Sequence, residues 1–406
     1  MNTFPPGYTG GAEVSAYHTC RELIRKGLFC SVLVVNNQTR SSADEHYTLD
    51  SIPVHRVQFS TFWRPAWKEV LDRRIYRTIR SELKRVKPDL VHIHNVSGAT
   101  LAAHVACRVA GVPVVNTLHD LWLLCPNNML YRQDGSFCDP AQTSKTCNQC
   151  FRRYTFWGNI PYRRAVFAAL TSNVKAFISP SQALIDLHIK AGYAPNRFRL
   201  IPYGIPAEVT SSPYHVGVRK FVASSHNYHN LVFAGGGVEI KGAHVLIQAI
   251  PLMMRHIENL RIAIAGGGER KYLSQFHQYG PTIHRLGPVP FNEMRTLFAA
   301  ADLTLVPSVW FENSPVVIYE NFHVGTPVVG SAFGGIPELI HERETGYLCS
   351  VGDPVTLAEK VILHFARSAQ ERRQMRHHCV ETVRTDFSMN RHIEGTLRHY
   401  HEILSQ

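Results

Sequence analysis

Residues 303–340 contain an alternation of strand and helix signals that constrains the fold more than any other part of the chain. Leu303–Val306 is a short apolar run closed by a proline, which is typical of a buried strand. Ser314 is a good helix N-cap and Pro315 suits the first helical position, so we expect a helix that Gly325 ends. A second apolar run follows, and the order strand–helix–strand predicts an α/β fold with a parallel sheet.

Two glutamates flank the predicted helix start. Glu312 precedes the helix, and Glu320 lies about one and a half turns into it. Between them, the N–H groups of Val316 and Val317 have no partner within the helix and carry the positive end of its dipole. This arrangement favours a phosphate with a carboxylate on each side. Carboxylates accept hydrogen bonds from sugar hydroxyls, so the pattern indicates a nucleotide-sugar ligand.

The same stretch resembles the signature of a known family. Glu312-x7-Glu320 is followed by Gly325-Thr-Pro-Val-Val and by Gly334-Gly335-Ile-Pro-Glu338. This pattern is similar to that of the retaining glycosyltransferases of group 1 (glycosyltransferase family four). The resemblance implies a GT-B architecture, in which two Rossmann-like domains with parallel sheets face a cleft and the C-terminal helix returns to the first domain.

The resemblance also implies the reaction. A sugar would move from a UDP- or GDP-linked donor to an acceptor hydroxyl with retention of anomeric configuration, in the synthesis of a polysaccharide or lipid-linked glycan. No Asp-x-Asp motif is present, so the expected reaction is metal-independent, with Lys241 and the helix start neutralising the leaving diphosphate. Gly236 stands where the family has an arginine, which removes one of two expected cations.

Residue roles follow from the resemblance position by position. Glu320 would hold the ribose, Glu312 would act catalytically at the transferring sugar, and the backbone at Pro288 and Val289 would hold the base. The implied donor-binding residues are Gly10, Gly11, Lys241, Pro288, Val289, Ser314, Val316, Val317 and Glu320.

His119 is the second candidate catalytic residue. The predicted strand Val112–Leu118 delivers it to the C-terminal end of a parallel sheet, where functional groups gather. A single histidine is more often structural, and this chain has 23. The sequence Thr-Leu-His-Asp resembles the family's catalytic loop, however, in which the histidine contacts the donor sugar.

The expected domains are an acceptor-side domain at residues 1–202, a linker at 203–228, a nucleotide-sugar domain at 229–388, and a returning helix at 389–406. The Gly10-Gly11 turn, which the resemblance places near the donor phosphate, has no strand before it. We therefore expect either a start further upstream or a first sheet that lacks a central strand.

Four cysteines lie within 26 residues, at Cys125, Cys138, Cys147 and Cys150. The last two form Cys-x2-Cys, a spacing that can hold tetrahedral zinc. Structural zinc, disulfides and free thiols all fit the spacing. An odd total of nine cysteines and a start without an apolar signal core argue for a reducing, cytoplasmic setting, which favours zinc.

The chain has a net charge of +12. No nucleic-acid motif accompanies the charge, so an anionic membrane surface or phosphorylated substrates are the expected partners. Residues 64–88 read as a basic helix with nine cations against three acids. This helix either packs on the sheet through its apolar stripe or meets anionic lipid at the inner face of the membrane.

Two other functions remain compatible with the sequence. A sugar-nucleotide epimerase can share the same architecture. A non-catalytic binding protein with a decayed donor site is the alternative that Gly236 and the missing strand suggest.

Overall fold

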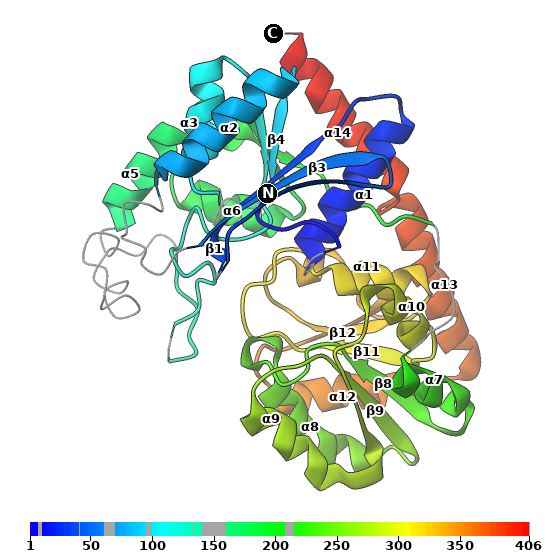
Figure 1. The fold of residues 1–406 in the computed structure, drawn as a ribbon. Helices are drawn as coiled ribbons and strands as arrows, with labels where there is room; N and C mark the ends of the chain where they lie inside the picture. Colours follow the sequence, from blue (N-terminus) through cyan, green and yellow to red (C-terminus); the bar gives the residue numbers. More distant parts are fainter. Residues whose placement is uncertain are drawn as a thin grey trace. The chain divides into compact units, whose positions relative to one another are not determined.

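The computed structural model describes residues 1–6, 10–39, 41–60, 70–94, 99–132, 134–139, 160–207 and 215–405. The chain divides into two compact units (Figure 1). Unit 1 comprises Met1–Gly204 together with Met389–Gln406, and unit 2 comprises Ile205–Ser388. None of the described helices is long and apolar enough to cross a bilayer.

Unit 2 is built on a six-stranded sheet in the order β10-β9-β8-β11-β12-β13, and every neighbouring pair is parallel. The strands are β8 His229–Phe233, β9 Leu260–Ala265, β10 Ile283–Gly287, β11 Leu303–Val306, β12 Val328–Ser331 and β13 Gly346–Cys349. Strand β11 has the bounds that its apolar run predicts, and its pairing with β12 is parallel as expected. The parallel α/β class is therefore confirmed.

Helices cover both faces of this sheet, which explains why its strands β11 and β12 are buried at every residue. They are α7 Val216–Ala223, α8 Ala243–Met254, α9 Arg270–Gln275, α10 Phe291–Ala299, α11 Val316–His323, α12 Pro354–Ala366 and α13 Ala369–Thr385. Short 3-10 segments are η3 Ser225–Asn227, η4 Glu239–Lys241, η5 Phe276–Thr282 and η6 Ile336–Glu338.

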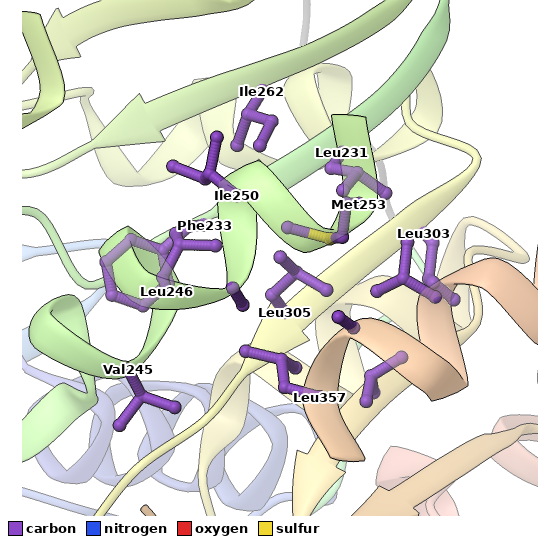
Figure 2. Close-up of a cluster of buried hydrophobic side chains, with 14 of the residues drawn as sticks. Leu231, Phe233, Val245, Leu246, Ile250, Met253, Ile262, Leu303, Leu305 and Leu357 are labelled. Atoms are coloured by element: carbon purple, nitrogen blue, oxygen red, sulfur yellow. The ribbon is translucent and has the colours of Figure 1, made fainter. Parts of the chain in front are cut away.

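Alternate residues of each strand enter different cores. Leu231 and Phe233 pack with α8 and α12 in one cluster, part of which Figure 2 shows. Val232, between them, packs with α7 and α10 on the opposite face. This period of two is the pleat of a β-strand, and it places both helical layers on buried apolar surface.

Unit 1 contains two separate sheets. In the first, β1 Val32–Thr39 pairs parallel with β3 Ile52–Ser60, which pairs antiparallel with β2 Ala43–Leu49. The second is parallel throughout, in the order β4 Val91–His94, β5 Val114–Thr117, β6 Val174–Ser179 and β7 Phe198–Leu200.

The described helices of unit 1 are α1 Gly11–Arg25, α2 Arg73–Val86, α3 Ala102–Ala110, α5 Ile160–Leu170, α6 Gln182–Lys190, the 3-10 turn η2 Pro195–Arg197, and α14 Met389–Leu404. The C-terminal helix α14 lies in the same unit as β5 and β6. Met389, Ile393 and Tyr400 are buried there against Val115 and Ile178.

Between the two sheets of unit 1 lies a mostly apolar groove. It is lined by one edge of β1, by β4 and by residues of α2 and α3, including Leu33, Val35, Leu83 and Ile93. Met1 hydrogen-bonds to this edge of β1: its amine donates to Leu33 O at 2.9 Å, and Val35 N–H donates to Met1 O at 2.9 Å. Among the described residues, no strand joins the sheets across this groove.

Three sequence predictions need correction. Residues 203–228 are not a featureless linker, because they contain α7, whose Val218 and Phe221 are buried in unit 2. The basic helix begins at Arg73 rather than residue 64, and residues 61–69 lie outside the described residues. Strand β2 was not predicted at all.

Candidate active site

The candidate site of unit 2 lies where the strand order reverses. From β8 the chain continues to β9 on one side, and it later places β11 on the other side of β8. Loops after these strands share the carboxyl edge of the sheet, and ligands of open α/β sheets bind at such a reversal. Val309 N–H, after β11, donates to Ile240 O, after β8, at 3.0 Å, so the two loops are joined.

This junction brings Lys241 and Glu312 together. Lys241 Nζ lies 2.7 Å from Glu312 Oε1, which also accepts hydrogen bonds from Ser308 Oγ at 2.8 Å and Trp310 Nε1 at 2.9 Å. Burial alone would raise the pKa of Glu312, but the Lys241 ammonium and these hydrogen bonds outweigh it and hold the pKa below its ordinary value. Glu312 is therefore a buried carboxylate, ionised at neutral pH.

The two glycines that follow β12 hold the Glu312 loop in place. Gly334 has φ +63, and a Cβ there would lie 2.3 Å from Glu312 O. Gly335 N–H donates to the same oxygen at 2.8 Å. Because only glycine allows this approach, the Gly-Gly pair fixes the backbone that carries the carboxylate.

Glu320, on α11, is 4% exposed and differs from Glu312 in its surroundings. Its Oε1 atom is buried and has no hydrogen-bond partner among the described residues. Burial raises the pKa of Glu320 to about 7, and the charge of Arg295 opposes that rise. An unpaired buried carboxyl oxygen is costly, so its presence indicates that a ligand supplies the missing hydrogen bond.

The start of α11 differs slightly from the prediction. The helix begins at Val316 with Pro315 as N-cap, so the assignment of Ser314 as the cap is wrong by one residue. The Ser314 and Tyr319 hydroxyls lie 2.6 Å apart instead. Val316 and Val317 occupy the first turn, whose N–H groups have no intrahelical acceptor. Their contact with a phosphate remains a prediction.

Gly236 occupies a confined position. Its φ is +55, and a Cβ would lie 1.9 Å from Gly267 O. An arginine side chain could not be accommodated here with this backbone. The absence of the expected cation is therefore a consequence of the conformation of this loop. Two other arginines of unit 2 are candidates for the missing positive charge. Arg285 hydrogen-bonds to His277, and Arg270 begins α9.

The predicted base-binding residues follow β10 at the same edge of the sheet. Gly287 O accepts a hydrogen bond of 2.7 Å from Gly266 N–H, which joins this loop to the one after β9. Pro288 is exposed, and Val289 packs partly into the cluster of α7 and α10. Their contact with a base is not tested by the geometry.

In unit 1, His119 follows β5 as predicted. Its Nε2 lies 2.8 Å from His94 Nδ1, and its Nδ1 lies 2.6 Å from Tyr203 Oη. Burial, reinforced by His392, lowers the pKa of His119 to about 3, so the ring is neutral at pH 7. Since both ring nitrogens already have partners, a sugar could bind to this ring only by replacing one of them.

Gly10 and Gly11 lie at the start of α1. Gly10 N–H donates to Glu13 Oε2 at 3.0 Å, so a carboxylate of the same helix already occupies part of the N-terminus. A donor phosphate would compete with Glu13 for this N–H group, and the assignment of these glycines remains a prediction.

The cysteine cluster is only partly described. Cys125 and Cys138 are half-buried, whereas Cys147 and Cys150 lie outside the described residues. Structural zinc at these four residues therefore remains a prediction.

Several polar residues of both sites were not predicted. Ser308 and Trp310 donate hydrogen bonds to Glu312, and the Tyr203 hydroxyl lies within hydrogen-bond distance of His119. The positive charge of Arg295 acts on Glu320. Ser308 and Trp310 lie in the same loop as Glu312 but carry no motif, whereas Arg295 and Tyr203 are distant in the sequence from the residues that they face. His94 could have been found, because it ends the predicted strand next to the one that delivers His119.

Comparison with known families agrees with this geometry. Residues 228–366 match the model "Glycosyl transferases group 1", and residues 9–209 match the model "Glycosyltransferase Family 4". Together the two matches span most of the chain. The protein belongs to the group 1 glycosyltransferases of family four.

Individual relatives carry corresponding names. The chain is 28% identical, over 67% of its length, to D-inositol 3-phosphate glycosyltransferase 1 of Catenulispora acidiphila. It is 30% identical, over 39% of its length, to WcaL of Escherichia coli K12, a glycosyltransferase whose assignment to colanic acid biosynthesis is provisional. The matches span 63% and 42% of these relatives, less than two-thirds of their length.

The fold has a close counterpart among solved structures. Anabaena HepE, solved in complex with UDP, matches with a TM-score of 0.72 at 18% identity, over 98% of both chains. The same protein has been solved with UDP-glucose. This likeness confirms the GT-B fold class with its two Rossmann-like domains.

Proposed function

We propose that this glycosyltransferase moves a sugar from a nucleoside diphosphate donor to an acceptor hydroxyl, with retention at the anomeric carbon and without a catalytic metal. The observation that carries the proposal is the pair of buried glutamates at the strand-order reversal of unit 2. The charge of Glu312 is compensated by Lys241, whereas Glu320 has a buried oxygen that finds no hydrogen-bond partner in the described part of the chain.

The difference between the two glutamates suggests different roles. Glu320 would accept hydrogen bonds from ribose hydroxyls in both the ground and transition states, which is uniform binding. Glu312 would stabilise the positive charge that develops on the transferring sugar, while Lys241 would face the leaving diphosphate. Glu312→Gln should then lower kcat more than it lowers nucleotide affinity.

We favour UDP as the nucleotide of the donor, because the HepE structures contain UDP and UDP-glucose. The names of the sequence relatives support glycans and phosphorylated cyclitols as candidate acceptors. We therefore propose glycan assembly as the setting. The predicted contact of His119 with the sugar belongs to this proposal and would be tested by His119→Ala.

The test is a transfer assay. The protein is incubated with UDP- or GDP-linked hexoses, with and without a panel of glycan acceptors, in buffer with and without EDTA. Acceptor-dependent nucleotide release, and a product whose anomeric configuration by NMR equals that of the donor, are expected in both buffers. Conversion of the donor to an epimer without acceptor would support the epimerase instead, and nucleotide binding without turnover would support a binding protein.

A further inference from the structure

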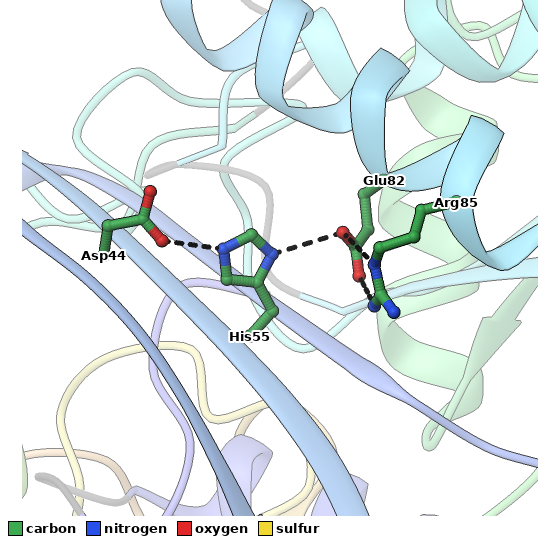
Figure 3. A network of polar contacts seen from close by, with 4 residues as sticks. All are labelled: Asp44, His55, Glu82 and Arg85. Atoms are coloured by element: carbon green, nitrogen blue, oxygen red, sulfur yellow. Dashed lines mark hydrogen bonds and ion pairs between the residues drawn. The ribbon is translucent and has the colours of Figure 1, made fainter.

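A second polar cluster lies in unit 1, on the hairpin formed by β2 and β3. It consists of Asp44, His46 and His55, whose ligand atoms all lie within 4.8 Å of one another. Figure 3 shows His55 between Asp44 and Glu82 of α2, with Arg85 on the other side of Glu82. The site proposed above uses none of these residues.

Strand register brings the three side chains together. His46 and His55 are direct partners in the antiparallel pair β2·β3, and their rings stack with centroids 4.0 Å apart. Asp44 lies two residues before His46 and therefore points to the same face of the sheet. The register of this hairpin therefore places two imidazoles and one carboxylate next to one another on one face of the sheet.

His55 is oriented in a way that suits a metal ligand. Its Nδ1 lies 3.2 Å from Glu82 Oε2, and its Nε2 lies 2.9 Å from Asp44 Oδ1. A proton on Nδ1, donated to Glu82, leaves the Nε2 lone pair directed at a carboxylate oxygen. That juxtaposition is favourable only if a cation, either a proton or a metal ion, lies between the two atoms. Carboxylates that accept the other N–H of a metal-bound histidine are a regular feature of such sites.

Glu82 is itself held in place. Arg85 hydrogen-bonds to both of its oxygens. The supporting carboxylate is therefore held in one orientation, while Asp44 and His46 are exposed and can adjust by rotation.

We propose that Asp44, His46 and His55 bind a divalent zinc-type ion, with Glu82 as the positioning residue for His55. Two imidazoles and one carboxylate form a ligand set that Zn²⁺ accepts, whereas Mg²⁺ and Ca²⁺ prefer oxygen ligands alone. His46, His55 and Glu82 line a surface pocket of about 230 Å³, which leaves room for a water as the fourth ligand. Bound metal would tie the β2–β3 hairpin to α2.

The test must separate this site from the cysteine cluster. The Cys147→Ser/Cys150→Ser protein, stripped with EDTA, is titrated with Zn²⁺, Co²⁺ and Mg²⁺ by calorimetry. We expect one Zn²⁺ per chain, a Co²⁺ spectrum without a thiolate charge-transfer band, no binding of Mg²⁺, and a higher melting temperature with Zn²⁺.

Variants of the exposed ligands decide the assignment, because they leave the core untouched. Asp44→Asn/His46→Asn in the same background should abolish Zn²⁺ binding, and Glu82→Gln should weaken it by about tenfold. His399→Asn is the matched control, since His399 makes a similar pair with Glu402 at 2.8 Å on α14, and it should change nothing. Absence of Zn²⁺ binding in the Cys-variant background, or binding that survives Asp44→Asn/His46→Asn, would overturn the proposal.

Discussion

At the residue scale, the two glutamates of unit 2 differ most in their protonation. Burial raises the pKa of Glu320 to about 7, whereas Lys241 keeps that of Glu312 low. The surroundings of each carboxyl group, rather than its place in the motif, set this difference. The sequence identified both residues but could not reveal this difference in protonation, because Lys241 and Arg295 reach the glutamates only through the fold.

Nucleotide binding should therefore depend on pH through Glu320. A ribose hydroxyl donates more strongly to an ionised carboxylate, so binding favours loss of the Glu320 proton. The pKa of Glu320 in the free protein is about 7. Nucleotide affinity should therefore weaken by up to about tenfold for each pH unit below that pKa and level off above it. Calorimetry from acid to neutral pH measures this. Dividing wild-type by Glu320→Gln affinities removes the nucleotide's own titration, and a flat ratio would contradict the role.

The Lys241–Glu312 pair should control stability with a recognisable pH profile. In the wild-type protein, the lowered pKa of Glu312 contributes stability above its ordinary pKa, and this stability is lost as pH falls through the folded value. Lys241→Met leaves a buried carboxylate uncompensated. Since Lys241 is partly exposed, the loss at neutral pH should be about 2 kcal/mol, below the full cost for a buried pair.

In the Lys241→Met variant, the pH dependence of stability has the opposite sign. Without the ammonium, burial raises the pKa of Glu312, so the variant should lose stability as pH rises above the ordinary carboxyl range. Urea unfolding near pH 5 and pH 8 measures this, and Lys241→Met/Glu312→Gln should recover most of the loss. Lys271→Met removes an exposed pair with Glu239 and should have little effect. Equal losses for the two lysine variants would argue against the pair.

At the element scale, the groove between β1 and β4 is the clearest structural feature without an occupant among the described residues. The amine of Met1 lies at its edge, and burial lowers the pKa of that amine to about 6. An apolar, strand-forming segment joined before Met1 would replace the buried amine with an amide N–H that can still donate to Leu33 O. It would also cover the apolar lining.

Such an extension should raise the melting temperature of the protein. A gain of about 1 kcal/mol corresponds to roughly 2–4 °C for a domain of this size. An extension of equal length made of Gly and Ser is the matched control, because it removes the free amine but buries no apolar surface. No difference between the two extensions would show that the groove does not accept a strand.

The elements also show what the sequence could reveal. The β11–α11–β12 segment was predicted closely because its apolar runs are interrupted by proline and glycine. Strand β2 was missed because its residues, from Ala43 to Leu49, are polar and mostly exposed at a sheet edge. Helix α7 was missed because the prolines and glycines around it resemble those of a linker. In both cases, packing against distant segments decides the structure.

At the scale of the whole molecule, the net charge of +12 remains without an assigned partner. On α2, Ile75, Ile79 and Leu83 are buried, which supports packing of its apolar stripe within unit 1. The exposed cations Arg73 and Arg77 on its outer side remain available to an anionic surface.

Flotation with liposomes tests this surface. We expect better recovery with anionic than with neutral vesicles at physiological salt, because basic residues near an anionic surface each contribute about 1 kcal/mol. Arg73→Glu/Arg77→Glu should reduce the difference. Arg384→Glu, a charge reversal on an exposed arginine of α13, is the control. Equal recovery with both vesicle types would contradict the proposed binding to anionic membranes.

The central claim is that unit 2 holds a nucleoside diphosphate through Glu320. Isothermal titration of the wild-type protein and of Glu320→Ala with UDP, GDP and ADP tests it most directly. We expect wild-type binding of one nucleotide per chain, with UDP preferred. Glu320→Ala should weaken binding by about 10- to 100-fold, the value of a hydrogen bond to a charged group, with an unchanged circular dichroism spectrum. Failure of the wild-type protein to bind any of the three, or unchanged affinity in Glu320→Ala, would contradict the account.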